Sequence, residues 1–404
     1  MYDHLKAIIK ERAKEQHAAI IAMRRHLHKH PELSFQEFKT AEFIAETLRA
    51  FDIEVQTGLA NTGLMALVKG KNPDKATVAL RADIDALPIL EANEVPYKSQ
   101  NKGVMHACGH DVHTSSLIGV AKLLNELKEE FEGTVKLIFQ PAEEEVPGGA
   151  LAMIKDGVLE HPSPAIVLGQ HVDTRLPVGK VAFMPGTMLA SADELHITVK
   201  GQGGHAAAPH LAVDPILIAA HIVVALQQIV TRRGNPTVPS VLSLCKISGG
   251  TTTNVIPETV QLAGTFRTTN EQWREEAHQQ MKDLACGLAQ GMGGHCEFII
   301  KKGYPCLDND AALTQRAMEA AKAFLGAEQV ITTELFMAAE DFAYYAQQRP
   351  ACFYYLGVQN KARGIEAGIH TPTFDVDEAA LEVGPGLMAW LALQELGRLG
   401  HLIP

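Results

Sequence analysis

The sequence has no uninterrupted apolar run of the ~20 residues that a membrane-spanning helix needs, so we expect no membrane span. Charged residues interrupt every apolar run near the N-terminus, so the hydrophobic segment of a signal peptide is missing there. Basic residues are the minority, because 36 Lys and Arg stand against 47 Asp and Glu, for a net charge of −11. A general nucleic-acid binder needs a basic face, so we expect no nucleic-acid partner.

Cysteine is sparse as well. The six cysteines, at positions 108, 245, 286, 296, 306 and 352, show no paired spacing, which predicts a reduced, cytoplasmic protein. What the sequence does have is ordinary globular composition, with 46% hydrophobic and 21% charged residues, and an unusually large number of histidines, 18. The length of 404 residues exceeds a typical domain of ~150 and predicts two or three domains.

Helical and strand-like segments alternate in the N-terminal part of the chain. Apolar residues recur at helical spacing through most of the first 50 residues, with a break at His30-Pro31. Strands are expected at 54–57, 64–69, 77–83, 135–140 and 165–171, and a helix at 113–131. After residue 303 the same style returns, with helices at 311–325 and 378–399 around a strand at 351–357. This order predicts an α/β domain with a mostly parallel sheet covered by helices.

The pattern between residues 187 and 302 is different. Strands are expected at 194–200, 240–247, 259–267 and 295–301, and helices at 214–232 and 271–291. The order β-α-β-β-α-β is typical of a ferredoxin-like α+β fold. We therefore expect one α/β domain, residues 1–186 and 303–404, with a second domain, residues 187–302, inserted into it.

Candidate metal ligands follow the strands of the α/β domain. Cys108 and His110 lie two residues apart in a Gly-containing loop, and thiolate and imidazole suit Zn²⁺, Co²⁺, Ni²⁺ or Mn²⁺. Three consecutive glutamates, 143–145, follow the strand at 135–140, while His171 ends a strand and His370 lies in a turn. Open α/β sheets place their sites at such strand ends. Taken singly, each residue is compatible with a structural role, but together they provide enough ligands for two metals.

Asp83 and Asp85 end another expected strand. A carboxylate often orients a metal-binding imidazole, and Asp83 is a candidate for that task. Asp85 is equally compatible with a loop aspartate that accepts hydrogen bonds from the backbone.

These motifs together resemble a family of metal-dependent amidohydrolases. The family includes hippurate hydrolase, N-acyl-L-amino acid amidohydrolase and the plant auxin–amino acid conjugate hydrolases, and belongs with the aminoacylase and glutamate carboxypeptidase-like metallopeptidases. The resemblance covers essentially the whole chain. The matching stretches are HKHPELSFQE (28–37), RADIDALPI (81–89), MHACGHDVHT (105–114), FQPAEEE (139–145), GQHV (169–172), GGHAAAPH (203–210), TNVIPETVQLAGTFRT (253–268), MAAEDFAYY (337–345) and GIHTPTFDVDE (368–378).

The resemblance implies a role for each matching residue. The implied ligands of two divalent metal ions (Zn, Mn, Ni or Co) are Cys108, His110, Glu144, His171 and His370, with the Cys108 thiolate bridging. Glu143 matches the general base, and Asp83 the orienting acid. Arg81 stands where the wider superfamily has a metal-binding His, which leaves the division of ligands between the metals open. Glu340 and Asp341 match a motif beside the metals whose role is not assigned.

The resemblance also gives the inserted domain a function. In relatives this domain is a lid that mediates dimer formation, so we expect a homodimer or homotetramer. His205 matches a histidine that reaches the partner subunit's site, where it would help to stabilise the oxyanion. Asn254 and Arg267 match substrate-holding residues, and a guanidinium binds a carboxylate bidentately. A strand-surface charge is the alternative for Arg267.

The expected activity is metal-assisted hydrolysis of the amide bond of N-acyl-L-amino acids, with Glu143 as the proton acceptor. Dipeptidase or carboxypeptidase activity is the first alternative. A thiol hydrolase with Cys108 as nucleophile is the second. The third is a non-catalytic binding protein, which would have no need of Glu143.

Overall fold

The computed structural model describes residues 2–402, and the described chain forms two compact units. Of the described residues, the first unit contains 2–186, 308–334 and 341–402, and the second contains 187–307 and 335–340. The short strands β7 (Gly186–Leu189) and β14 (Leu307–Asn309) lie where the chain passes from one unit to the other. Segment 335–340 packs with the second unit, whereas the sequence predicts residues 303–404 as part of the α/β domain.

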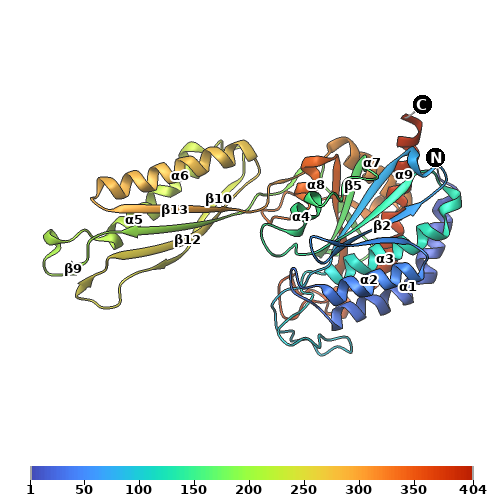
Figure 1. The fold of residues 1–404 in the computed structure, drawn as a ribbon, viewed down its shortest axis with the longest axis horizontal. Coiled ribbons are helices and arrows are strands. Elements are labelled where there is room, and N and C mark those ends of the chain that lie inside the picture. Colours follow the sequence, from blue (N-terminus) through green and yellow to red (C-terminus); the bar gives the residue numbers. More distant parts are fainter. Residues whose placement is uncertain (1, 403–404) are drawn as a thin grey trace. The chain divides into compact units, whose positions relative to one another are not determined.

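The first unit is built on one mixed eight-stranded sheet (Figure 1), in the order β1-β2-β4-β3-β5-β16-β6-β15. Its strands β4, β3, β5 and β16 are mutually parallel, as expected for strands joined by helical crossovers. The strands are β1 (Glu54–Leu59), β2 (Gly63–Lys69), β3 (Thr77–Asp83), β4 (Thr134–Gln140), β5 (Ile166–Pro177), β6 (Val181–Phe183), β15 (Val330–Thr332) and β16 (Ala351–Gln359). The predicted α/β architecture is confirmed.

Helices cover this sheet. Helices α1 (Leu5–Lys29), α3 (His110–Glu126) and α9 (Ala380–Leu402) pack against one another. The others are α2 (Phe38–Ala50), α4 (Gly149–Lys155), α7 (Ala311–Leu325) and α8 (Ala343–Gln348). Strand β4 is buried on both faces: Val135 and Leu137 join the main core, while the neighbouring Lys136 donates from Nζ to the carbonyls of Val158 and Glu160 just after α4. Burial on both faces explains the nearly continuous apolar run of this strand.

The second unit has a four-stranded antiparallel sheet in the order β10-β12-β8-β13. Its elements are β8 (Asp193–Lys200), α5 (Pro215–Gln228), β10 (Ser240–Ser248), β12 (Thr259–Thr268), α6 (Glu271–Gly291) and β13 (His295–Lys302), with a two-stranded ribbon of β9 (Gly204–His205) and β11 (Val255–Ile256) (Figure 1). Both helices pack on the sheet through apolar residues. The β-α-β-β-α-β order confirms the predicted ferredoxin-like fold.

One helical segment, Pro215–Arg233, is long and apolar enough to cross a membrane by length and composition alone. The segment is not an uninterrupted apolar run, because His221, Gln227 and Gln228 lie within it and Arg232 and Arg233 end it. The evidence for a span is weak, because a core helix passes the same test. Ile218, Ile222 and Leu226 of this segment are buried in the core of the second unit, which accounts for one apolar face. Ile216, Leu217 and Val224 remain exposed on the same helix.

Candidate metal centre

The structure brings the five predicted ligands together at the carboxyl-terminal edge of the large sheet. Cys108 Sγ lies 3.4 Å from His171 Nε2 and 3.3 Å from His370 Nε2. Glu144 Oε1 lies 3.1 Å from His370 Nε2 and 3.9 Å from His110 Nε2. Ligands 2.0–2.3 Å from a tetrahedral ion are roughly 3.5 Å apart, so these spacings suit a metal. They form two overlapping groups that share Cys108, namely Cys108-His110-His171 and Cys108-Glu144-His370.

The chemistry of these donors also fits a cation. Within residues 2–402, the buried atoms His110 Nε2 and Glu144 Oε1 have no hydrogen-bond partner. Burial raises the pKa of the Cys108 thiol well above its ordinary value, and the carboxylates of Glu144, Glu143 and Asp83 raise it further. A thiolate at this position therefore needs a compensating positive charge, which a metal ion provides.

Local backbone geometry places Glu143, Glu144 and His370. Strand β4 ends at Gln140, and Ala142 then adopts a left-handed conformation with φ 51°, directly before the glutamates. His370 is also left-handed, with φ 60°, and its N–H donates to the carbonyl of Ala107, 2.7 Å away. That hydrogen bond ties the loop of His370 to the loop of Cys108. Left-handed residues other than glycine are uncommon and often occur at functional sites.

The carboxylate that contacts the His110 imidazole is that of Asp85. Asp85 Oδ1 lies 3.1 Å from His110 Nδ1, and Oδ2 accepts from the backbone N–H of Glu144 at 3.0 Å and from Ser34 Oγ at 2.7 Å. Although burial lowers it, Asp83, Asp85 and Glu144 raise the pKa of His110 to about 10. Three carboxylates thus surround one imidazole, which again favours a cation here.

The predicted orienting acid, Asp83, has different partners. Its Oδ1 lies 2.6 Å from Nδ1 of His113, and its Oδ2 accepts from Arg81 Nη1 at 2.7 Å. Its Oδ2 is 3.8 Å from Nε2 of His110, which is the nitrogen that faces the ligand cluster. Asp85 therefore makes the closer carboxylate contact with His110, and the role of Asp83 as an orienting acid stays a prediction.

Glu143 is buried, and one of its carboxylate oxygens lies within 4.8 Å of ligand atoms of His110 and Glu144. A further residue, Glu37, holds the loop that carries Glu143, and the sequence did not indicate this contact. Glu37 is buried and accepts from the backbone N–H of Ala142 at 2.9 Å and from Thr62 Oγ1 at 2.6 Å. Glu37 lies in a stretch that resembles the family, which is the one sequence feature that singles it out. Its contact with Ala142, 105 residues away, could not be predicted from sequence spacing.

Asp341, whose role was unassigned, holds the other side of the same loop. Its Oδ2 accepts from the backbone N–H of Ala150 at 2.9 Å, and Gln140 Nε2 donates to both of its oxygens at 2.8 Å. Arg81 Nη2 donates to Oδ1 at 2.8 Å. Gly148 has φ 86°, and a Cβ added to it would lie 2.4 Å from Asp341 Oδ2, so only glycine fits. Glu340 is assigned to the second unit.

The remaining predicted residues lie in the second unit. His205 is exposed on β9 and pairs with Val255 of β11, and the carbonyl of Asn254 accepts from the N–H of Ala206 at 3.0 Å. The ribbon therefore brings His205 and Asn254 together. Arg267 lies on β12, where its Nη1 donates to the carbonyl of Met337 at 2.7 Å. The roles of these residues toward a substrate stay predictions.

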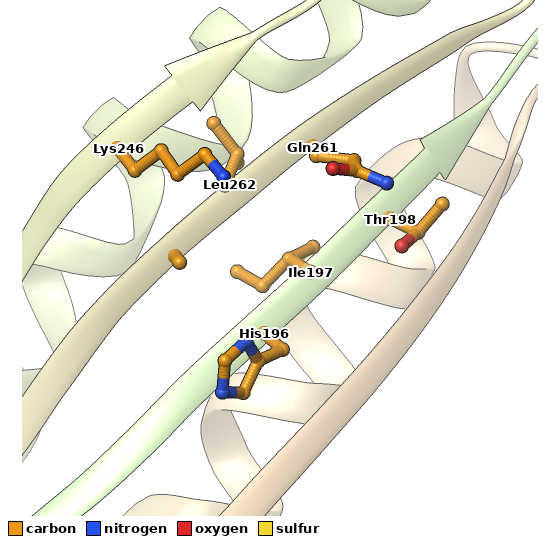
Figure 2. A pocket seen from close by; sticks show the side chains of 7 residues that line it. His196, Ile197, Thr198, Lys246, Gln261 and Leu262 are labelled. Atoms are coloured by element: carbon orange, nitrogen blue, oxygen red, sulfur yellow. The ribbon is translucent and has the colours of Figure 1, made fainter.

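A concavity of about 160 Å³ lies on the sheet of the second unit (Figure 2). Side chains from β8, β10 and β12 line it, among them His196, Thr198, Lys246 and Gln261. His196 Nε2 lies 3.0 Å from Oε2 of Glu194. This polar lining contains none of the predicted site residues.

Comparison with known proteins gives one consistent result. The model of peptidase family M20/M25/M40 matches residues 79–394. The chain is 41% identical to N-acetylcysteine deacetylase of Bacillus subtilis, covering 93% of this chain and 97% of that protein. It is 39% identical to thermostable carboxypeptidase 2 of Saccharolobus solfataricus, covering 96% of this chain and 98% of that protein. Among solved structures, the YXEP protein of Bacillus subtilis, a dinuclear metal binding peptidase from the M20 family, superposes with a TM-score of 0.82 at 37% identity, covering 95% and 99%.

Proposed function

Because the chain belongs to peptidase family M20/M25/M40, we propose that it hydrolyses the amide bond of N-acyl-L-amino acids and releases a carboxylic acid and an amino acid. Family membership makes it a metal-dependent hydrolase that acts on amides. The observation that carries the finer proposal is the pair of ligand groups that share Cys108, with Glu143 beside them. The similarity to an N-acetylcysteine deacetylase supports an N-acyl amino acid as substrate.

The ligand groups would hold two divalent metal ions, Zn, Mn, Ni or Co. Cys108, shared by both groups, would bridge the ions, and the other ligands would be His110, Glu144, His171 and His370. The dinuclear site of the YXEP protein supports this number. When bound, such ions polarise a carbonyl and lower the pKa of water. A mixed sulfur, nitrogen and oxygen donor set suits several transition metals, so metal analysis decides their identity.

Glu143 is the proposed general base. It is buried next to Glu144 and His110, so a substrate amide held at the ligand cluster would lie within its reach. Its carboxylate would accept the proton of the attacking water and pass it to the leaving amine nitrogen. Glu144 would bind the metal, and a metal-bound carboxylate is a poorer base. The two neighbouring glutamates would therefore have different roles, Glu144 as ligand and Glu143 as base. Asp83 would act indirectly, through its contact with His113.

The chain is proposed to divide into a catalytic domain, residues 1–186 and 303–404, and a lid domain, residues 187–302. Arg267 and Asn254 of the lid domain would hold the substrate, Arg267 through the amino-acid carboxylate, and His205 would stabilise the oxyanion in the partner subunit's site. We expect a homodimer or homotetramer. The exposed apolar side chains of α5, Ile216 and Leu217, support this assembly, because an exposed apolar patch is typical of an interface. The six cysteines are free in the structure, which is consistent with the proposed cytoplasmic location.

Carboxypeptidase activity is the second candidate, and the similarity to a thermostable carboxypeptidase favours it. A thiol hydrolase fits less well, because a reactive cysteine needs a lowered thiol pKa and that of Cys108 is raised. A purely binding protein would not need Glu143.

The deciding experiment uses the full chain stripped of metal with a chelator and reconstituted with Zn²⁺, Mn²⁺, Ni²⁺ or Co²⁺. Each form is assayed on acetyl, benzoyl and indole-acetyl amino acids, and on unblocked dipeptides and N-blocked peptides. We expect hydrolysis of N-acyl amino acids that depends on added metal. Cleavage of peptides alone would favour the carboxypeptidase, and activity that survives metal removal but not alkylation of Cys108 would contradict both.

A further inference from the structure

His113 is buried on the first turn of α3, three residues after His110, and both of its ring nitrogens are engaged. Nδ1 lies 2.6 Å from Asp83 Oδ1, and the backbone N–H of Val172 donates to Nε2 at 2.9 Å. An imidazole nitrogen that accepts a hydrogen bond carries no proton, so the ring proton lies on Nδ1 and faces Asp83. In this arrangement His113 has no lone pair left for a metal, although it lies in a group with Asp83 and His110.

Val172 follows His171 directly and is held at both of its backbone polar groups. Its N–H donates to His113, and its carbonyl accepts from Nδ1 of His171 at 2.7 Å. The second hydrogen bond places the proton of His171 on Nδ1 and leaves Nε2 for the ligand cluster, 3.4 Å from Cys108 Sγ. The orientation of the His171 ring therefore depends on where the Val172 backbone lies.

Gly109 lies close to the side chain of Val172. It has φ 86°, and a Cβ added to it would lie 2.5 Å from Val172 Cγ2. Glycine is therefore required here for both conformation and space, and the loop of Cys108 can approach Val172 closely.

We propose that His113 is a positioning residue for the metal site: through the N–H of Val172 it fixes the backbone that sets the orientation of His171, and it does not bind the metal itself. This inference rests on the proposed function, because it assumes that His171 is a ligand.

The surroundings of His113 support the neutral ring that this role requires. The N–H of Val172 donates to Nε2, which leaves the ring proton on Nδ1, 2.6 Å from Asp83 Oδ1. The charge of Asp83 is balanced on its other side by Arg81, which in turn pairs with Asp341 at 2.8 Å. His113 thus receives a fixed acceptor at Nδ1 and can offer Nε2 to Val172.

Two substitutions of His113 separate its two hydrogen bonds. His113→Asn places an amide nitrogen near the position of Nδ1, so it retains a donor for Asp83 but is too short to reach Val172. His113→Gln places an amide oxygen near the position of Nε2, so it retains an acceptor for the N–H of Val172. His106→Gln is the matched control, because His106 is equally buried and, in the described chain, neither of its ring nitrogens has a hydrogen-bond partner.

The primary readout is metal affinity, measured by competition with a chelator for Zn²⁺ and for Co²⁺, with circular dichroism to verify folding. For His113→Asn we expect a loss of roughly 10–100-fold, the usual effect of removing a residue that orients a ligand. His113→Gln should recover most of the affinity, and His106→Gln should match the parent protein. Equal losses in both His113 variants would mean that His113 is a ligand, and unchanged affinity in both would mean that it is inert; either result overturns the proposal.

If His113→Asn does not fold, Gly109→Ala replaces it, since its methyl group would lie 2.5 Å from Val172 Cγ2 and 3.4 Å from Phe374 Cζ; the substitution also strains the loop between Cys108 and His110. We expect weaker metal binding in that variant, and parental affinity would overturn the proposal. Metal affinity is measured without substrate, so the two proposals can fail separately. If the variants show the expected metal affinities but the protein cleaves no N-acyl amino acid, the proposed function is contradicted and the role of His113 is not.

Discussion

Asp85 lies with its Oδ1 3.1 Å from Nδ1 of His110, while its Oδ2 accepts the backbone N–H of Glu144. One carboxylate thus contacts two proposed ligands that are 34 residues apart in the sequence. Such an arrangement orients both ligands before a metal binds, which reduces the conformational entropy that their side chains lose on metal binding.

Asp85→Ala should therefore weaken metal binding by roughly 10–100-fold, because His110 Nδ1 keeps only the Asp85 carbonyl, 3.0 Å away, and the loop of Glu144 loses its anchor. Chelator competition measures the change. Ser34→Ala is the control, since Ser34 donates only to Asp85 Oδ2, and it should have a much smaller effect. Equal affinities in the parent protein and Asp85→Ala would show that His110 is oriented by other contacts.

Three consecutive glutamates allow an internally controlled test of the base. Glu143→Gln should lower kcat by roughly 10²–10⁴-fold while bound metal, measured by elemental analysis, stays at the parental level. Glu144→Gln should lose metal. Glu145 is exposed, so Glu145→Gln should retain both metal and turnover. Near-normal kcat in Glu143→Gln would refute its role as the base.

Acid stability of the second unit should depend on Asp193. Its carboxylate accepts from Arg274 Nε at 2.9 Å and lies 2.6 Å from Nε2 of His278. Although burial raises it, the hydrogen bonds from His278 and Arg274 lower the pKa of Asp193 to about 2. The folded-state pKa is below the unfolded value of about 3.9, so this stabilisation is present above pH ~4 and is lost as the pH falls toward 2.

Asp193→Asn should thus reduce the free energy of unfolding of the metal-free protein by about 2 kcal/mol at neutral pH, and the difference from the parent should shrink between pH 4 and 2. Urea titrations at several pH values measure it. The adjacent Glu194 is exposed and makes only exposed ion pairs, so Glu194→Gln should change little. A difference that does not depend on pH would mean that Asp193 acts through packing rather than charge.

The exposed face of α5 should mediate self-association. Leu217→Glu or Val224→Glu would place a charge in an apolar interface and should shift the protein toward the monomer. Sedimentation or light scattering measures the mass. Gln290→Glu adds the same charge at an exposed position on α6 and should not change the mass. An unchanged mass in both α5 variants would place the interface elsewhere.

The sequence alone determined the main elements of both units. Local periodicity is strong in long segments, so 77–83 and 271–291 were predicted with the bounds that β3 and α6 have. Short elements such as β6 and α8 were missed, because three to six residues cannot display a period. The helix expected at 214–232 is present as α5 and the helical turn that follows it, and α5 is apolar on an exposed face as well as on its buried one.

The sequence also determined which residue types gather at the sheet edge, since Glu144 follows the end of β4 and Cys108 lies just before α3. His171 was expected to end a strand, but β5 continues to Pro177, so His171 lies within it. Only the tertiary structure decided their partners. Asp83 and Asp85 are two residues apart and of the same type, yet Asp83, the last residue of β3, contacts His113, while Asp85, beyond the strand, contacts His110. Hydrogen bonds between distant segments depend on register and loop path, and one sequence contains neither.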